Sequence, residues 1–250
     1  MVNQSRLIAV IPAAGFARRL GDEIVGSKEA LDVGGSPAAA HLLRRLAAAN
    51  IDRAVIALRR GKWDVPEALQ GDHLHGVAVA YVMVDETPSP AHTIAPALRL
   101  VPDDVIALAF PDVIYEPAAA FTSMLDTQQE TGADVVLGLF PTTAPERVDM
   151  VELDGHGHPV AIVIKQPDRG LTYSWTLALW TPRFTTFLLA AVADAEGAGL
   201  PEGREFQIGA VVQAAIEAGL VVRGHTFPEG SYVDIGTPEE LERIRRLPHL

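Results

Sequence analysis

The sequence has 250 residues, of which 48% are hydrophobic, so the chain can bury a full core and is too apolar to be intrinsically disordered. Its formal net charge of -12 argues against general binding to nucleic acid, whose phosphates would repel it. With no cysteine, disulfides, thiolate metal sites and a cysteine nucleophile are excluded. No apolar run approaches the roughly 18 residues of a membrane-spanning helix, and we expect a soluble, cytoplasmic protein.

Short apolar runs alternate with longer amphipathic stretches over the first 140 residues. The strand-like runs are residues 7–12, 53–59, 77–84, 105–110 and 133–140, and the helix-like stretches are residues 36–50, 63–70, 93–100 and 117–132. This alternation predicts βαβ units and an α/β fold with a mostly parallel sheet that helices cover on both faces. Ser36 and Pro37 are expected as N-cap and first residue of a helix over 37–49.

The pattern changes after about residue 140. Shorter alternating strands follow in "MVELDGHGHPVAIVIKQP" and "LTYSWTLALW", then helices near 182–194 and 207–218 and a last helix that Thr237 caps. Because no Ser/Gly-rich linker intervenes, we expect a second lobe of the same domain. We interpret "DGHGHP", with His156 and His158, as a polar hairpin loop rather than a metal site, and Trp175 and Trp180 as strand residues.

The first strand ends in small residues followed by cations, in "PAAGFARRL". In open parallel sheets ligands bind beyond the carboxyl ends of the strands, and small residues let backbone N–H groups approach an anion there. The stretch is neither a Walker A loop nor a dinucleotide fingerprint. A tight turn with solvated arginines is the alternative. The cations at residues 59–62 in "LRRGKWD" are interpreted as a solvated strand end rather than a polyanion site.

Two carboxylates later in the chain each lie next to a predicted strand or helix. Asp112 follows the strand "VIALAF" and a proline, and Asp234 precedes a helix start in "YVDIGTPEEL". Taken singly, each is most often a turn former or a helix cap.

The order of these short motifs resembles the sugar-1-phosphate nucleotidylyltransferases, especially the glucose-1-phosphate thymidylyltransferase-like group. That family has "LAGGxGTRL", a lysine before "xLxPV", "QPxPxGLAxA", "GD", "EEKP" and "GExxITD". Here the corresponding segments are "PAAGFARRL", "SKEALDV", "DETPSPAHTIAPAL", "FPDVIY", "VIKQP" and "REFQIGA", and the closing "DIGTPE" matches almost letter for letter. The resemblance extends over nearly the whole chain.

This resemblance implies a Rossmann-like open mixed, mostly parallel sheet with a smaller sugar-binding lobe, as in the nucleotide-diphospho-sugar transferases. It implies one domain over 1–250, with a nucleotide-binding half of about 1–140 and a sugar-phosphate-binding half of about 141–250. The implied residues are Arg19 and Lys28 for catalysis; Ala13, Ala14, Gly15, Phe16, Ala17, Arg18, Glu86 and Thr93 for nucleotide binding; Lys165, Glu205 and Trp175 for the sugar phosphate; and Asp112 and Asp234 for Mg²⁺.

The implied activity joins a nucleoside triphosphate and a sugar-1-phosphate to give an NDP-sugar and pyrophosphate. Neither nucleic acid nor a membrane is expected as a partner, and a homo-oligomer stays open. Two alternatives are a cytidylyltransferase for a non-sugar phosphate and a non-catalytic homologue that binds nucleotide or sugar.

Several positions depart from the family pattern. Ala14 and Ala17 replace glycines of the loop, Arg18 replaces a small hydroxyl residue, Leu177 replaces a glycine near the sugar pocket, and Gly209 replaces an aspartate. Because the proposed metal, arginine and lysine positions persist while these recognition positions differ, we expect a substrate other than that of the best-known members.

The two adjacent arginines are expected to differ in their effect on turnover. If Arg19 stabilises charge on the departing pyrophosphate, Arg19→Ala lowers kcat and kcat/KM together by roughly 10² to 10³, whereas Arg18→Ala raises the KM for the triphosphate modestly. Steady-state kinetics of the two variants is the measurement. Equal losses of kcat, or a larger loss at Arg18, would show that the alignment through "GFARRL" is wrong by one residue.

Overall fold

The computed structural model describes residues 6–16, 26–164, 170–198 and 206–245. Its strands are β1 (Leu7–Ala13), β2 (Asp32–Val33), β3 (Ser36–Pro37), β4 (Arg53–Arg59), β5 (Ala78–Val84), β6 (Val105–Leu108), β7 (Val113–Glu116), β8 (Val135–Pro141), β9 (Asp149–Leu153), β10 (Pro159–Ile164), β11 (Tyr173–Trp180), β12 (Val222–Thr226) and β13 (Ser231–Asp234). Its helices are α1 (Ala38–Ala48), α2 (Asp64–Ala68), α3 (Pro90–Leu98), α4 (Ala120–Thr131), α5 (Pro182–Ala198), α6 (Ile208–Glu217) and α7 (Pro238–Arg245), with 3-10 turns η2 (Lys28–Ala30) and η3 (Gly71–Leu74).

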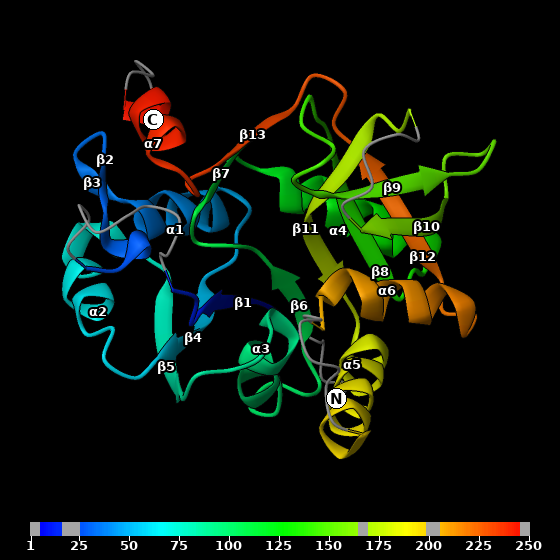
Figure 1. Cartoon of the computed structure of the whole chain (residues 1–250), viewed down its shortest axis with the longest axis horizontal. Helices are drawn as coiled ribbons and strands as arrows, with labels where there is room; N and C mark the ends of the chain where they lie inside the picture. Colours follow the sequence, from blue (N-terminus) through cyan, green and yellow to red (C-terminus); the bar gives the residue numbers. More distant parts are fainter. Residues whose placement is uncertain (1–5, 17–25, 165–169, 199–205, 246–250) are drawn as a thin grey trace.

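Across the described part of the chain, nine strands form one mixed sheet (Figure 1). In the N-terminal part, β6, β1, β4 and β5 lie side by side and are all parallel. Strand β11 pairs antiparallel with β6 and with β8, and β12 pairs parallel with β8. The predicted α/β class with an open mixed sheet is confirmed, and one continuous sheet joins the two halves.

Successive residues of β1 alternate between two cores, because side chains of a strand point to opposite faces of the sheet. Ile11 belongs to the core that includes residues of α1 and α4, while Val10 belongs to the core on the other face, which includes residues of α3, α5 and α6. The helices therefore cover both faces, as the apolar runs predict. This leaves the carboxyl ends of β1, β4 and β6 as the place where loops can hold a ligand.

A third, smaller core fixes the segments around the two predicted metal ligands. Ile114 of β7, Ile235 after β13 and Leu241 of α7 pack with Val33 and Ala38. Figure 1 shows β13 running beside β7 toward α7. The last helix therefore holds the end of β13 against β7.

The predicted start of the first helix is wrong by one residue. Ser36 and Pro37 pair with Val33 and Asp32 in a two-residue hairpin, so Pro37 keeps an extended ψ of 142° and becomes the N-cap residue. Helix α1 begins at Ala38.

The last helix begins as predicted, since the N–H of Glu240 donates to Thr237 Oγ1 at 3.3 Å. The hairpin loop at "DGHGHP" is also confirmed. It joins the antiparallel strands β9 and β10, and Asp154 Oδ1 accepts the N–H groups of His156 and His158 at 2.8 and 2.9 Å.

Among the described residues, no helix is both long enough and apolar enough to cross a membrane.

Arg45 is expected to stabilise the contact between α1 and β7. It is 2% exposed, and its guanidinium donates to the carbonyl of Tyr115 at 2.6 Å and to Glu116 Oε1 at 2.8 Å. Arg45→Met removes these bonds and should lower the free energy of unfolding by about 2–4 kcal/mol. Denaturant unfolding measures this, and Arg44→Met, at the exposed neighbouring position, is the matched control. Equal stabilities of the two variants would contradict the assignment.

Candidate active site

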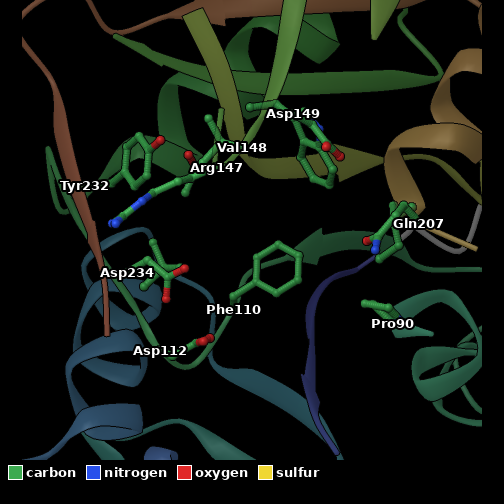
Figure 2. Close-up of a pocket in the computed structure, with 13 residues that line it drawn as sticks. Pro90, Phe110, Asp112, Arg147, Val148, Asp149, Gln207, Tyr232 and Asp234 are labelled. Atoms are coloured by element: carbon green, nitrogen blue, oxygen red, sulfur yellow. The ribbon is translucent and has the colours of Figure 1, made fainter. Parts of the chain in front are cut away.

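Strand pairing brings the two predicted metal ligands together. Asp112 directly precedes β7, Asp234 ends β13, and in the antiparallel register Asp234 lies opposite Val113. The N–H of Ile235 donates to the main-chain carbonyl of Asp112 at 2.7 Å. Both carboxylates line one pocket, with Asp112 largely buried and Asp234 exposed (Figure 2).

Lys28 is the cation of this cluster. Its ammonium forms an ion pair with Asp112 Oδ2. Burial disfavours the charged ammonium, but the neighbouring carboxylates, Asp112 above all, outweigh it and raise the Lys28 pKa above its ordinary value. The side chain is therefore cationic at neutral pH, which suits a group that contacts phosphate oxygens.

Two pockets meet at Asp112. One, of about 560 Å³, is lined by the small-residue loop and includes Gly15, Lys28 and Glu86; we call it the loop pocket. The other, of about 230 Å³, includes Trp175 and Asp234; we call it the tryptophan pocket. Asp112, Phe110 and Pro90 line both. Such a shared wall lets two ligands approach one another beside a carboxylate.

The donor set at the shared wall fits a magnesium ion. Asp112 and Asp234 offer carboxylate oxygens, which are the ligands that Mg²⁺ prefers, and one or two carboxylates with substrate phosphates are its usual coordination. In the described residues, no group of three or more His, Cys, Asp or Glu side chains could hold a metal by itself.

The structure places many of the predicted nucleotide-binding residues at the loop pocket. Ala14, Gly15, Phe16, Glu86 and Thr93 line it.

Among these side chains, the Thr93 hydroxyl is engaged within its own segment, at 2.5 Å from the Thr87 hydroxyl and 3.1 Å from the carbonyl of Ser89. Ala13 ends β1 and is buried. Its carbonyl, rather than its side chain, makes the polar contact described below.

Trp175 lines the tryptophan pocket, and its ring lies against Phe110 with centroids 6.3 Å apart. Its indole Nε1 is buried without a hydrogen-bond partner among the described residues. The remaining predicted site residues lie outside the described residues, namely Ala17, Arg18, Arg19, Lys165 and Glu205.

Sequence analysis missed several polar residues of the tryptophan pocket, namely Arg147, Asp149, Gln207 and Tyr232 (Figure 2). Asp149 explains one departure from the family pattern. A Cβ at Gly209 would lie 2.7 Å from Asp149 Oδ2, so the carboxylate of β9 fills the space beside α6. Where the resemblance implies an aspartate on this helix, the structure has a carboxylate that comes from β9. No local motif marks Asp149, and only its neighbour Gly209 gave a signal.

The prediction of a solvated strand end at residues 59–62 is wrong for Lys62. This lysine is 4% exposed, because its ammonium is held by the carbonyls of Ala13 and Gly15 and by the carboxylate of Glu29. The local sequence at residues 59–62 does not reveal that buried oxygen acceptors from other segments surround Lys62.

The sequence of this chain matches a family model. The model of the MobA-like NTP transferase domain matches residues 9–169, more than half of the chain. The chain belongs to the MobA-like NTP transferase family. A curated relative of this MobA-like chain, the 3-deoxy-manno-octulosonate cytidylyltransferase of Rhodopseudomonas palustris (strain HaA2), is 30% identical over 146 residues. The match covers 58% of the present chain and 46% of that protein, so it spans about half of the relative's length.

Solved structures share the fold of this MobA-like chain. A Bacillus anthracis protein described as a glucose-1-phosphate thymidylyltransferase, in complex with sucrose, has a TM-score of 0.81 at 19% identity, covering 96% of this chain and 94% of that one. UDP-glucose pyrophosphorylase from Acinetobacter baumannii has a TM-score of 0.79 at 16% identity, covering 96% and 92%. The predicted resemblance to nucleotidylyltransferases is confirmed at the level of family and fold.

We expect both carboxylates of the MobA-like site to be needed for metal binding. Asp112→Asn and Asp234→Asn each replace a charged oxygen by an amide, and each should weaken Mg²⁺ binding in the presence of a nucleoside triphosphate at least tenfold, as measured by calorimetry. The fold should persist, because the contact from Ile235 uses the main chain of Asp112.

Asp85→Asn, at an exposed carboxylate that pairs with Arg60, is the control and should leave the affinity unchanged. Unaltered Mg²⁺ affinity in both site variants would contradict the metal assignment.

Proposed function

We propose that this protein transfers a nucleotidyl group from a nucleoside triphosphate to a sugar-1-phosphate, giving an NDP-sugar and pyrophosphate. The observation that carries the proposal is the meeting of the loop pocket and the tryptophan pocket at Asp112, beside the cationic Lys28. A transfer between two anionic substrates needs two chambers that join where the charges converge. Membership of the MobA-like family supports the reaction type.

In the proposed reaction a phosphate oxygen of the sugar-1-phosphate attacks the α-phosphorus in line. The new oxygen–phosphorus bond forms as the bond from the α-phosphorus to the bridging oxygen breaks, and pyrophosphate leaves with that electron pair. An ionised phosphate is already nucleophilic, so no protein base has to remove a proton. The protein then acts mainly through positioning and charge stabilisation.

Individual residues take the following roles in the proposal. The loop pocket holds the triphosphate, and Lys28 contacts the α-phosphoryl oxygens, exchanging its ion pair with Asp112 for a substrate oxygen. Asp112 and Asp234 would hold Mg²⁺, which when bound supplies positive charge to the phosphate oxygens. From the resemblance, Arg19 stabilises the leaving pyrophosphate and Lys165 binds the sugar phosphate. Trp175 and Glu205 contact the sugar.

A second candidate is cytidylyl transfer to an acceptor other than a sugar-1-phosphate. Two observations favour it: the match to a 3-deoxy-manno-octulosonate cytidylyltransferase and the presence of Arg147 in the tryptophan pocket. Arg147 pairs with Glu240 at 3.2 Å and is exposed, so an acceptor carboxylate or phosphate can replace that partner at low cost. The non-catalytic alternative has less support, because Lys28, Asp112 and Asp234 come together in one site.

A substrate panel distinguishes these functions. The purified protein is incubated with Mg²⁺ and each nucleoside triphosphate against sugar-1-phosphates, polyol phosphates and sugar acids, and pyrophosphate release is followed with mass spectrometry of the product. We expect release that depends on both substrates and yields an NDP-sugar.

A CMP-linked sugar acid or polyol would favour the second candidate. Triphosphate binding by calorimetry without turnover of any pair would favour the non-catalytic homologue, and Lys28→Met is the matched inactive control in every case.

A further inference from the structure

The turn that runs from the last residue of β4 to the first residue of α2, residues 59–64, contacts the end of β1 from which the small-residue loop departs. Lys62 Nζ donates to the carbonyl of Ala13 at 2.9 Å and to that of Gly15 at 3.3 Å. Arg59 Nε donates to the carbonyl of Ala14 at 3.2 Å. Three successive carbonyl oxygens of the loop are thus held by two cations of one turn.

The same turn also contacts the far end of the loop, next to Lys28. Asp64 accepts the N–H of Ser27 at 2.5 Å and the Ser27 hydroxyl at 2.8 Å. Gly26 has a φ of +108°, and a Cβ there would lie 2.9 Å from Asp64 Oδ2, so the chain passes Asp64 where only glycine is unstrained. Arg59, Lys62 and Asp64 therefore hold both described ends of the loop, and we call the turn that carries these three side chains the clamp turn.

Lys62 has no donor left for a ligand. An ammonium carries three N–H groups, and the carbonyls of Ala13 and Gly15 and the carboxylate of Glu29, at 2.5 Å, account for all three. The side chains of Lys62 and Glu29 are 5% and 0% exposed. A phosphate could reach this lysine only by displacing buried partners, so its contribution lies in what it holds.

The carbonyls that Lys62 and Arg59 hold set the direction of the loop amides. In a planar trans peptide the N–H points opposite to the C=O. When the carbonyls of Ala13, Ala14 and Gly15 point to the clamp turn, the N–H groups of the same peptides point away from it. Ala14, Gly15 and Phe16 line the loop pocket. Oriented amides of this kind form concave anion sites.

We propose that Lys62 is a positioning residue that, through the carbonyls of Ala13 and Gly15, aims the loop amides at the triphosphate, with Glu29 as its fixed counter-ion. The inference rests on the proposed function, because it takes the loop pocket as the triphosphate site. Burial disfavours both charges of the pair: it lowers the pKa of Lys62 and raises that of Glu29, and each partner offsets the shift of the other. Among the described residues, Glu29 is the one carboxylate that accepts from the buried Lys62 ammonium.

Two variants separate positioning from stability. Lys62→Met leaves the Glu29 carboxylate buried and unpaired, so it should lower both the melting temperature and the affinity for Mg²⁺ with the triphosphate identified for the wild type. The double variant Lys62→Met with Glu29→Met removes both charges and should recover most of the lost melting temperature. Its triphosphate Kd should remain at least tenfold above that of the wild type, because the loop carbonyls still lack their donor.

The control is Arg60→Met, at an adjacent, exposed cation that pairs with Asp85, and it should leave the Kd unchanged. Hydrogen exchange of the amides of residues 13–16 provides a readout apart from activity, and it should be faster in the double variant. A stable double variant that binds the triphosphate as tightly as the wild type overturns the positioning role. A wild type that binds no triphosphate overturns the proposed function instead.

Discussion

The antiparallel pairing of β7 with β13 is the constraint on which the candidate site depends. It sets Asp234 opposite Val113, next to Asp112, and the main-chain bond from Ile235 to Asp112 closes that end of the ladder. Two packing contacts hold it: the small apolar core under α7, and the buried Arg45 that ties β7 to α1. Without this pairing the two carboxylates would belong to distant segments, and neither could complete a metal site with the other.

Although the net charge of the protein is -12, two lysines near the small-residue loop are each paired with a carboxylate. Lys28 pairs with Asp112, and the adjacent Glu29 pairs with Lys62, so consecutive residues of η2 serve two different ion pairs. The first pair lies at the junction of the two pockets, and in the proposed function its cation exchanges Asp112 for a phosphate oxygen. The second is sealed under the loop, where exchange would strand a buried charge. One short turn therefore carries one residue of an ion pair at the pocket junction and one residue of a buried ion pair.

Some positions around this cluster of charges depart from the pattern of the resembled family. Where the resembled family has an aspartate, this chain has Gly209, and Asp149 from β9 occupies the space. The tryptophan pocket combines this carboxylate with Arg147 and Trp175, a mixture suited to an acceptor with hydroxyl and anionic groups. Membership of the MobA-like family does not by itself specify the acceptor substrate. The polar side chains that line the pocket are therefore better evidence for the substrate than the fold is.

The sequence by itself determined the α/β class, because alternating apolar runs and amphipathic stretches have few other ways to bury their surfaces. The order of its short motifs also predicted Lys28, Asp112 and Asp234 as site residues, and the structure places these three close together. Sequence analysis misjudged Lys62 and the start of α1, and for Asp149 it gave only the indirect signal of Gly209. Lys62 is buried against the carbonyls of Ala13 and Gly15, and the start of α1 is set by the hairpin that pairs Asp32 with Pro37. Asp149 occupies the space beside Gly209. Tertiary structure decided these features because burial and hydrogen bonding are properties of assembled neighbours, which local residue patterns do not encode.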